Sequence, residues 1–372
     1  MKKVGILSMQ RIANYGSFLQ AYGLKHILED LGCDVQFVDY HPGKTLIPAD
    51  GGSGIKRKIS KALEAFKYNA PLKEKIKFIK YKKNYAKNYY PYLGIGEMNY
   101  SPELDLLVIG SDEVFNCVQN NSNVGFSPEL FGVDNNAKKV ITYAGSFGNT
   151  NIEKLKKYGV DKEVASYLKN IDTISVRDNN SGNIVKELTG KEPIYNLDPV
   201  LAYDFIGKCQ EIPATVLEGK YMILYGYAGR FTKDECKNIR EYANSKGLKI
   251  FCIGGVQDAC DKFIDCNPFQ VIAYFQHADC VVTDTFHGTI LSVITHRKFV
   301  SVVRNIGYGN SEKMIDLLGR LGLEDRIIEE LNAVGVKISE VIDYVKVDEV
   351  IKEERERSYM YLKKEIEQCI QS

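Results

Sequence analysis

The sequence predicts an α/β protein built from two parallel-sheet domains. Short apolar runs of strand length alternate with helical patterns along most of the chain, as in βαβ units. The alternation runs in two successive series, which meet near residue 200. A chain of 372 residues also exceeds what one hydrophobic core usually supports. We therefore expect an N-terminal domain of residues 1–200 and a C-terminal domain of residues 201–346.

The first forty residues predict a strand–helix–strand unit. Residues 4–8 form a short apolar run, and residues 34–40 alternate as a second strand does. Apolar side chains recur at helical spacing between them, and Gly32 stands where a helix often ends in glycine. Two strands joined through a helix pair in parallel. Further strands of this domain are expected at residues 104–109, 140–144 and 173–176.

The second series carries clearer helix signals. Thr232 and Glu235 have the spacing of a capping box, and Asn267 precedes Pro268 as a helix cap precedes a first-turn proline. The strands predicted around these helices are residues 221–225, 249–253, 280–283 and 299–303.

Two segments stand outside the α/β alternation. Residues 51–90 form a helical insert rich in lysine and tyrosine, with twelve Lys or Arg residues between positions 56 and 87. A basic amphipathic segment with interleaved aromatic residues can rest on an anionic membrane, and a solvated surface helix is the alternative. The charged helical pattern of residues 347–372 either packs back across the domain junction or lies on the surface.

The composition narrows the class of protein. The formal net charge is +1, so no global field favours nucleic acid. The apolar runs have strand length and are too short to cross a bilayer, and the N-terminal apolar stretch ends at Gln10 and Arg11 before a signal-peptide core forms. Nine cysteines without a Cys-x-x-Cys pair predict reduced thiols and no metal site. We expect a cytoplasmic protein.

Four groups of motifs occur along the chain: Asn-Tyr-Gly at 14–16 with Leu-Gln-Ala at 19–21; GSDEVFN at 110–116; YAGSFG at 143–148, SVRD at 175–178 and LDP at 197–199; and TDTFHGTILSVITHRKFV at 283–300. Together they resemble the polysaccharide pyruvyl transferase family. Glu113 and Phe115 in the second group and Thr285 in the fourth depart from residues found in other members.

The resemblance implies a fold similar to glycosyltransferase-B enzymes, with two Rossmann-like domains facing a cleft. It implies phosphoenolpyruvate as donor co-substrate with no other cofactor, and a sugar or lipid-linked oligosaccharide as acceptor. The product would be a pyruvate ketal on a cell-surface polysaccharide or its precursor, with phosphate released. An enzyme with a lipid-linked acceptor would work at the inner face of the membrane.

The chemistry of the last motif agrees with this resemblance. His287 and Gly288 follow a predicted strand, at the edge of an open α/β sheet where ligands bind. Backbone N–H groups near Gly288 and Thr289 are expected to receive donor oxygens. His287 is expected to take a proton from the sugar hydroxyl, with donation to the methylene carbon left open. A capping or packing histidine is the alternative.

The donor carboxylate and phosphate are also expected to bind arginines, because the planar guanidinium group matches the geometry of both anions. Arg177 and Arg304 follow predicted strands and are assigned to donor binding, against the alternative of surface ion pairs. The acceptor site is assigned to residues that otherwise serve as turn or cap residues: Asn14, Gly16, Asp112 and Asp284.

Two other functions remain open at this point. The same two-domain fold serves nucleotide-sugar glycosyltransferases, although the sequence has no G-x-G-x-x-G fingerprint. A carbohydrate-binding protein without catalytic activity is the second alternative.

Overall fold

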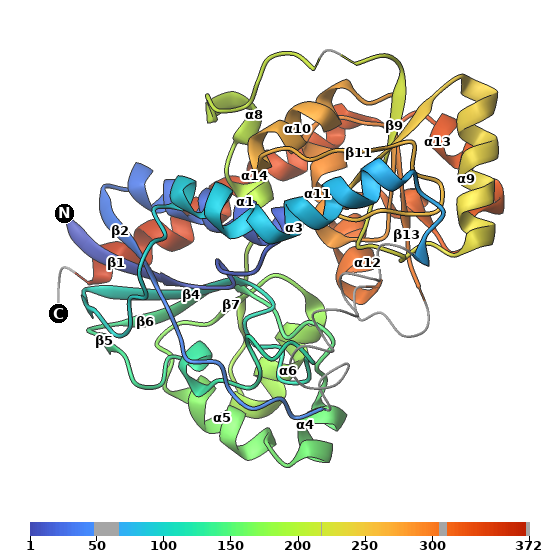
Figure 1. Cartoon of the computed structure of the whole chain (residues 1–372). Coiled ribbons are helices and arrows are strands. Elements are labelled where there is room, and N and C mark those ends of the chain that lie inside the picture. Colours follow the sequence, from blue (N-terminus) through green and yellow to red (C-terminus); the bar gives the residue numbers. More distant parts are fainter. Residues whose placement is uncertain (48–66, 217, 305–310, 370–372) are drawn as a thin grey trace.

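The computed structural model describes residues 1–47, 67–216, 218–304 and 311–369, which form two α/β domains (Figure 1). Every strand pair within the two main sheets is parallel. The chain passes from the first sheet to the second between Tyr195 and Tyr221.

The N-terminal sheet has six strands in the order β2-β1-β4-β6-β7-β8. The chain therefore reverses its direction of winding between β1 and β4, which creates a switch point at the carboxyl ends of these strands. The strands are β1 (Lys2–Leu7), β2 (Cys33–Val38), β4 (Leu106–Asp112), β6 (Val140–Gly145), β7 (Ser175–Val176) and β8 (Ile194–Tyr195). A separate small pair joins β3 (Glu103–Leu104) and β5 (Asn136–Ala137).

The C-terminal sheet has the order β11-β10-β9-β12-β13-β14, which is the Rossmann order. Its switch point lies between β9 and β12. The strands are β9 (Tyr221–Tyr225), β10 (Lys249–Ile253), β11 (Lys262–Phe263), β12 (Cys280–Thr283), β13 (Phe299–Val302) and β14 (Ile327–Ile328).

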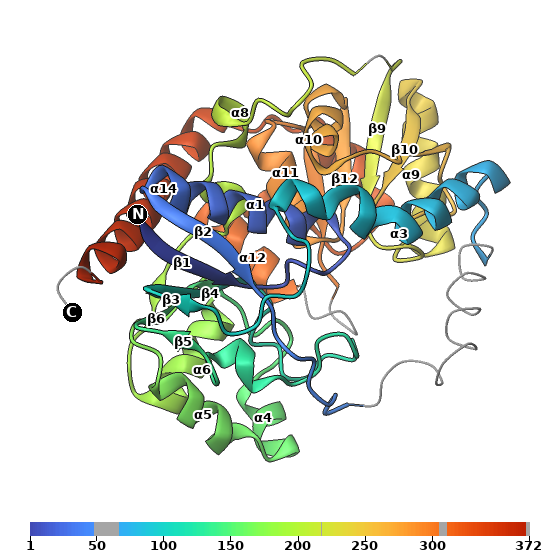
Figure 2. The ribbon, with the colours of Figure 1, turned by 60° about the vertical axis from the view of Figure 1, so that its left-hand side comes forward.

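Helices connect the strands and cover the sheets (Figures 1 and 2). They are α1 (Tyr15–Asp30), α3 (Leu72–Leu93), α4 (Ile152–Tyr158), α5 (Asp161–Lys169), α6 (Asn179–Thr189), α7 (Pro199–Ala202), α8 (Phe205–Lys208), α9 (Lys233–Lys246), α10 (Pro268–His277), α11 (Phe286–Ile294), α12 (Ser311–Arg320), α13 (Val334–Ser339) and α14 (Tyr344–Gln368).

The predicted fold class is confirmed: two Rossmann-like domains face each other, the arrangement of the glycosyltransferase-B type. Both expected helix caps are present, with capping boxes at Thr232 and Asn267. The prediction of one strand over residues 104–109 is wrong at its N-terminal end, where the structure has two strands, β3 and β4. They are separated at Asp105, whose carboxylate accepts the Lys3 N–H at 3.0 Å.

Helix α3 belongs to the insert but docks on the C-terminal domain. Phe78 packs edge-on against Phe263 of β11, and Tyr89 donates a hydrogen bond to the Cys266 carbonyl at 2.9 Å. Phe78, Tyr81 and Tyr85 of the proposed membrane segment are buried, so these aromatic side chains do not face a lipid surface. Residues 56–66 of the proposed membrane segment lie outside the described residues.

Helix α14 runs from one domain to the other. Near its start, Asp348 lies 2.9 Å from the His296 ring of the C-terminal domain. Near its end, Tyr361 donates to the Thr142 carbonyl in β6 at 2.8 Å, and Glu365 pairs with Lys139 at 2.7 Å. The helix therefore ties the two domains together on the side away from α3 (Figure 2).

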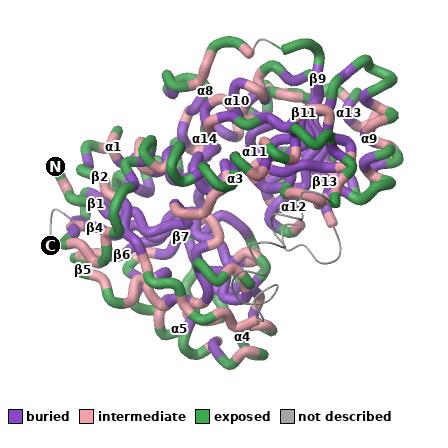
Figure 3. Tube along the Cα trace, in the orientation of Figure 1, coloured by how far each residue is buried: buried purple, intermediate pink, exposed green. Residues whose placement is uncertain are grey.

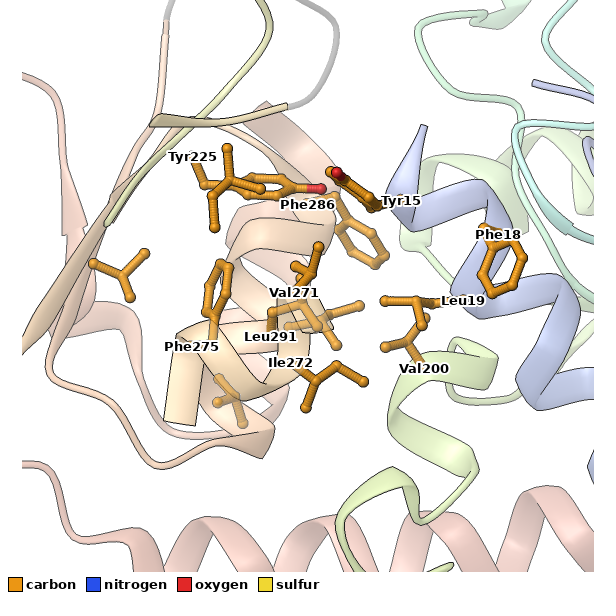
Figure 4. Close-up of a cluster of buried hydrophobic side chains, with 14 of the residues drawn as sticks. Tyr15, Phe18, Leu19, Val200, Tyr225, Val271, Ile272, Phe275, Phe286 and Leu291 are labelled. Carbon is orange, nitrogen blue, oxygen red and sulfur yellow. The ribbon is translucent and has the colours of Figure 1, made fainter. Parts of the chain in front are cut away.

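One apolar core is continuous across the domain junction (Figures 3 and 4). Phe18 of α1 packs edge-on against Phe269 of α10, with ring centroids 5.7 Å apart. Leu19 faces α10 and α11 from the same helix (Figure 4). A large apolar interface limits the motion of one domain relative to the other. We therefore infer that this interface holds the switch points of the two sheets at a fixed distance and orientation.

Two further sequence expectations concern the cysteines and the helices. All nine cysteines are free and buried. Within the described ranges, no helix combines the length and the apolar character needed to span a bilayer.

Candidate active site between the two domains

A pocket lies where the switch points of the two sheets meet. The space between its walls is about 630 Å³, open solvent at its mouth included. Its walls come from residues 13–17 at the start of α1, Asp112 and Glu113 at the end of β4, residues 225–227 after β9, residues 285–287 at the start of α11, and Tyr81, Lys82, Gly254 and Lys313.

His287 faces a buried carboxylate. Its Nε2 lies 3.7 Å from Oδ2 of Asp198 and has no hydrogen-bond partner within the described part of the chain. This distance is longer than a hydrogen bond, but a small movement of the ring would close it. Burial alone raises the pKa of Asp198, yet His287 and the Arg177 guanidinium outweigh burial and lower that pKa to about 2. Asp198 is therefore a carboxylate that can orient the imidazole.

Arg177 lies beneath the pocket and is already engaged by two carboxylates. Its Nη1 donates to Oδ2 of Asp198 at 2.6 Å, and its Nη2 lies 3.5 Å from Oδ1 of Asp112. The side chain is 1% exposed, and its guanidinium stacks over the Phe286 ring at 4.6 Å. His287 and Arg177 thus both face Oδ2 of Asp198, although only Arg177 is within hydrogen-bond distance of it. Arg177 positions Asp198 and does not reach the pocket surface.

Gly16 allows α1 to approach the histidine. A Cβ atom at this position would lie 2.2 Å from Nδ1 of His287, closer than any real contact. The ring is therefore held between the α1 backbone on its Nδ1 side and Asp198 on its Nε2 side. The sequence assigned Gly16 to the acceptor site; the structure places it against His287 in the wall of the pocket.

Gly16→Ala is expected to lower turnover by about 100-fold, because it displaces the imidazole by roughly an ångström. The measurement is product formation under saturating substrates. Gly96→Ala is the matched control, since a Cβ at Gly96 meets nothing within 4 Å. Equal activity of the two variants would show that the position of the His287 ring does not matter.

Helices α1 and α11 both begin at the pocket. Thr285 caps α11 by accepting the Gly288 N–H at 3.0 Å, and the Thr289 N–H donates to the Thr285 carbonyl. The N–H groups of Gly288 and Thr289, which were expected to bind the donor, are thus engaged within the helix, and neither residue lines the pocket. Phe286 and His287, whose N–H groups precede the first intrahelical bond, do line the pocket.

Gly288 and Thr289 have packing roles. A Cβ on Gly288 would lie 2.1 Å from Oγ1 of Thr283, so glycine lets α11 approach β12. The Thr289 hydroxyl is buried and lies 2.7 Å from the Ser301 hydroxyl, away from the pocket.

Lys313 of α12 brings a positive charge into the pocket. It forms an ion pair across the cleft with Glu113, and its Nζ lies 5.5 Å from the centre of the Phe286 ring. Burial alone raises the pKa of Glu113, but Lys313, helped by Arg177 and Asn116, outweighs burial and lowers that pKa to about 2. Together with Lys82 and His287, Lys313 makes up the set of basic side chains found among the described pocket residues.

The other two acceptor candidates of the N-terminal domain, besides Gly16, also lie at the pocket. Asp112 accepts a hydrogen bond from the Ser17 hydroxyl at 2.6 Å and also contacts Arg177. Asn14 caps α1 by accepting the Ser17 N–H at 2.7 Å. The alternative structural roles of these residues as turn and cap residues are thus present, and both still line the cavity.

Arg304 and Asp284 lie beside the pocket but are not among the residues that line it. Arg304 forms two hydrogen bonds to Glu235, at 2.8 and 3.2 Å. Asp284 accepts a hydrogen bond from Arg230 at 2.8 Å, and burial raises the pKa of its carboxyl. Both residues belong to an ion-pair network of the C-terminal domain. An ion pair is the alternative that the sequence left open for Arg304.

Sequence reasoning missed three of the charged residues at this site. Asp198 stands in the Leu-Asp-Pro motif, and an aspartate before proline is a helix-cap signal that could have singled it out. Glu113 was noted only as a departure from the family motif. Lys313 lies outside every motif, and no local signal marks it.

The structure is thus a two-domain α/β protein of the glycosyltransferase-B architecture, with a pocket between the switch points of its two sheets. A family model described as polysaccharide pyruvyl transferase matches residues 14–305. The chain belongs to this family.

Solved structures resemble the chain only in outline. The O-GlcNAc transferase of Thermobaculum terrenum is 10% identical, with 99% of this chain and 66% of that chain covered and a TM-score of 0.44. The UDP-GlcNAc 2-epimerase of Methanocaldococcus jannaschii, in complex with UDP-GlcNAc and UDP, is 10% identical, with coverages of 95% and 99% and a TM-score of 0.47. The calicheamicin glycosyltransferase CalG4 is 12% identical, with coverages of 100% and 98% and a TM-score of 0.46. A comparison with curated proteins finds no match. Likeness at this level says nothing about substrate or reaction.

Proposed function

We propose that this enzyme transfers the pyruvyl group of phosphoenolpyruvate to two hydroxyls of a sugar in a polysaccharide or its precursor. Both hydroxyl oxygens bond to the central carbon of the donor, whose methylene group gains a proton and becomes a methyl group. The phosphate leaves with the oxygen that bound it to the enol carbon and takes the proton of the second hydroxyl. The observation that carries this proposal is the convergence of His287, Lys313 and the start of α11 in one pocket.

The pocket suits an anionic donor. Helices α1 and α11 both begin at its wall, and the N-terminus of a helix carries partial positive charge and free N–H groups. Lys313 and Lys82 add full charges. In the structure Glu113 pairs with Lys313, and a bound phosphate or carboxylate would replace Glu113 as the partner of this lysine.

In this proposal His287 moves the proton. Asp198 would accept Nε2–H, leaving Nδ1 as a base on the side of Gly16 and the pocket. Arg177 and the N–H of Val200, which donates to Asp198 at 3.0 Å, hold the carboxylate in place. This arrangement favours proton removal from the sugar hydroxyl.

The direct test is phosphate release from phosphoenolpyruvate, assayed with a panel of lipid-linked and nitrophenyl sugars. We expect release that depends on the acceptor, and a product whose NMR spectrum shows the new ketal methyl group. Release of UDP from UDP-sugars, with no consumption of phosphoenolpyruvate, would support a nucleotide-sugar glycosyltransferase instead. Sugar binding without turnover of either donor would support a binding protein.

Lys313→Met is expected to raise the KM for phosphoenolpyruvate by roughly 10- to 100-fold, because a charge-assisted hydrogen bond to the donor is lost. The measurement is initial rate against donor concentration. Lys337→Met serves as control, since it also breaks a lysine–glutamate pair in the same domain, to Glu340 at 3.2 Å.

The double variant Glu113→Gln/Lys313→Met separates two explanations. If Lys313 binds the donor, the KM stays high when the stranded Glu113 charge is removed. A KM restored to the wild-type value would mean that the single variant acted only through Glu113.

A further inference from the structure

We propose that the outer face of α3 lies against an anionic membrane surface beside the pocket. This basic face consists of four lysines and two aliphatic residues, Lys73, Lys80, Lys83, Lys87, Leu72 and Ile76.

The orientation of α3 separates this face from the protein core. Tyr81, Tyr85 and Tyr89 recur every fourth residue and are buried against the two domains. At 3.6 residues per turn, the residues of the basic face lie on the opposite side of the helix. The one glutamate of its first turn, Glu74, is 1% exposed and points inward, where it accepts the Phe263 N–H at 2.9 Å.

The chemistry of the basic face matches lipid headgroups. Its four lysines are exposed and offer ammonium groups to lipid phosphates. Leu72 and Ile76 are 60% and 42% exposed and can enter the apolar boundary between the headgroups. A nucleic acid is the less fitting partner, because α3 has no arginine and its central tyrosines are buried and cannot stack on bases.

The position of α3 connects this face to the pocket. Lys82, which lies on the flank of the helix between the buried and the basic faces, lines the pocket. Helix α3 crosses from the N-terminal domain to the edge of the C-terminal sheet at the front of the molecule (Figure 1). A sugar held on a lipid carrier would therefore reach the pocket from the surface on which α3 rests. This last step depends on the proposed function, whereas membrane contact itself does not.

The test is co-sedimentation of the full chain with phosphatidylcholine vesicles and with vesicles that also contain phosphatidylglycerol. We expect binding to the anionic vesicles that weakens as salt is added. Lys73→Ser/Lys80→Ser/Lys83→Ser/Lys87→Ser should lower this binding at least about tenfold. The control Lys233→Ser/Lys237→Ser/Lys246→Ser/Lys249→Ser removes the same charge from exposed positions in and around α9 and should bind as the wild type does.

Several outcomes would overturn the proposal. They are equal binding to neutral and anionic vesicles, equal loss in both quadruple variants, or salt-sensitive binding to duplex DNA without vesicle binding. Phosphate release with soluble nitrophenyl sugars should be unchanged in the α3 variant, because none of its four lysines lines the pocket. Vesicle binding without any pyruvyl transfer would reject the proposed function and leave the membrane surface standing.

Discussion

Replacing His287 by alanine is expected to lower turnover by about 10²- to 10⁴-fold while phosphoenolpyruvate still binds. The imidazole is the group in the pocket wall that is backed by a buried carboxylate, Asp198, at 3.7 Å. Its removal takes away the proton acceptor for the sugar hydroxyl, whereas the α11 N-terminus and Lys313 remain to hold the donor. The measurements are steady-state turnover and calorimetric titration with phosphoenolpyruvate.

His277→Ala is the control for this experiment. His277 lies in α10 with its Nδ1 2.8 Å from the Ala273 carbonyl, and it does not line the pocket. The pH profile of the wild type then distinguishes the two proton roles. A base loses activity as falling pH protonates it, and an acid loses activity as rising pH removes its proton. Near-normal turnover of His287→Ala across the pH range would make the histidine structural.

Replacing Arg177 by methionine is expected to reduce the free energy of unfolding by about 3–5 kcal/mol, because it strands a buried carboxylate. The side chains of Asp198 and Arg177 are each 1% exposed and lie 2.6 Å apart. In the variant solvent would therefore not reach the Asp198 carboxylate, and among the described residues no other cation lies within hydrogen-bond distance of it. Without its partner Asp198 would also cease to orient His287, so turnover should fall with stability. Urea denaturation with the slope checked for constancy measures the first effect.

Arg240→Met provides the matched comparison. Arg240 also pairs with an aspartate, Asp261, at 2.8 Å, but both side chains are about one-third exposed and the expected loss is about 0.2–1 kcal/mol. Arg177→Met/Asp198→Asn should recover part of the stability, because the stranded charge is gone. A stable Arg177→Met enzyme with only a raised KM for phosphoenolpyruvate would show instead that Arg177 binds the donor, as the sequence suggested.

The elements of the fold were predictable because their signals are local. The strands over residues 221–225, 249–253 and 280–283 have the predicted bounds. Each is a short apolar run flanked by caps or turns, and the capping boxes at Thr232 and Asn267 form between residues three positions apart. The family motifs likewise placed His287 at the end of a strand, where the parallel sheet puts ligands.

The pairing of charges was not predictable in this way. Arg177 looks like a donor ligand in the sequence, but the fold buries it against Asp198, 21 residues away. Lys313 carries no motif and enters the pocket only because α12 approaches Glu113 from the other domain, 200 residues away in the chain.

The sequence by itself therefore determined the α/β class, the two parallel sheets, the family and the histidine at the strand edge. The tertiary structure alone decided which charged groups remain open to a substrate and which neutralise one another. It also decided that the backbone of Gly16 lies too close to His287 for any side chain at position 16, and that Tyr81, Tyr85 and Tyr89 of α3 are buried. The physical reason is that strand and helix signals arise between neighbouring residues, whereas burial and ion pairing depend on how two distant sheets come together.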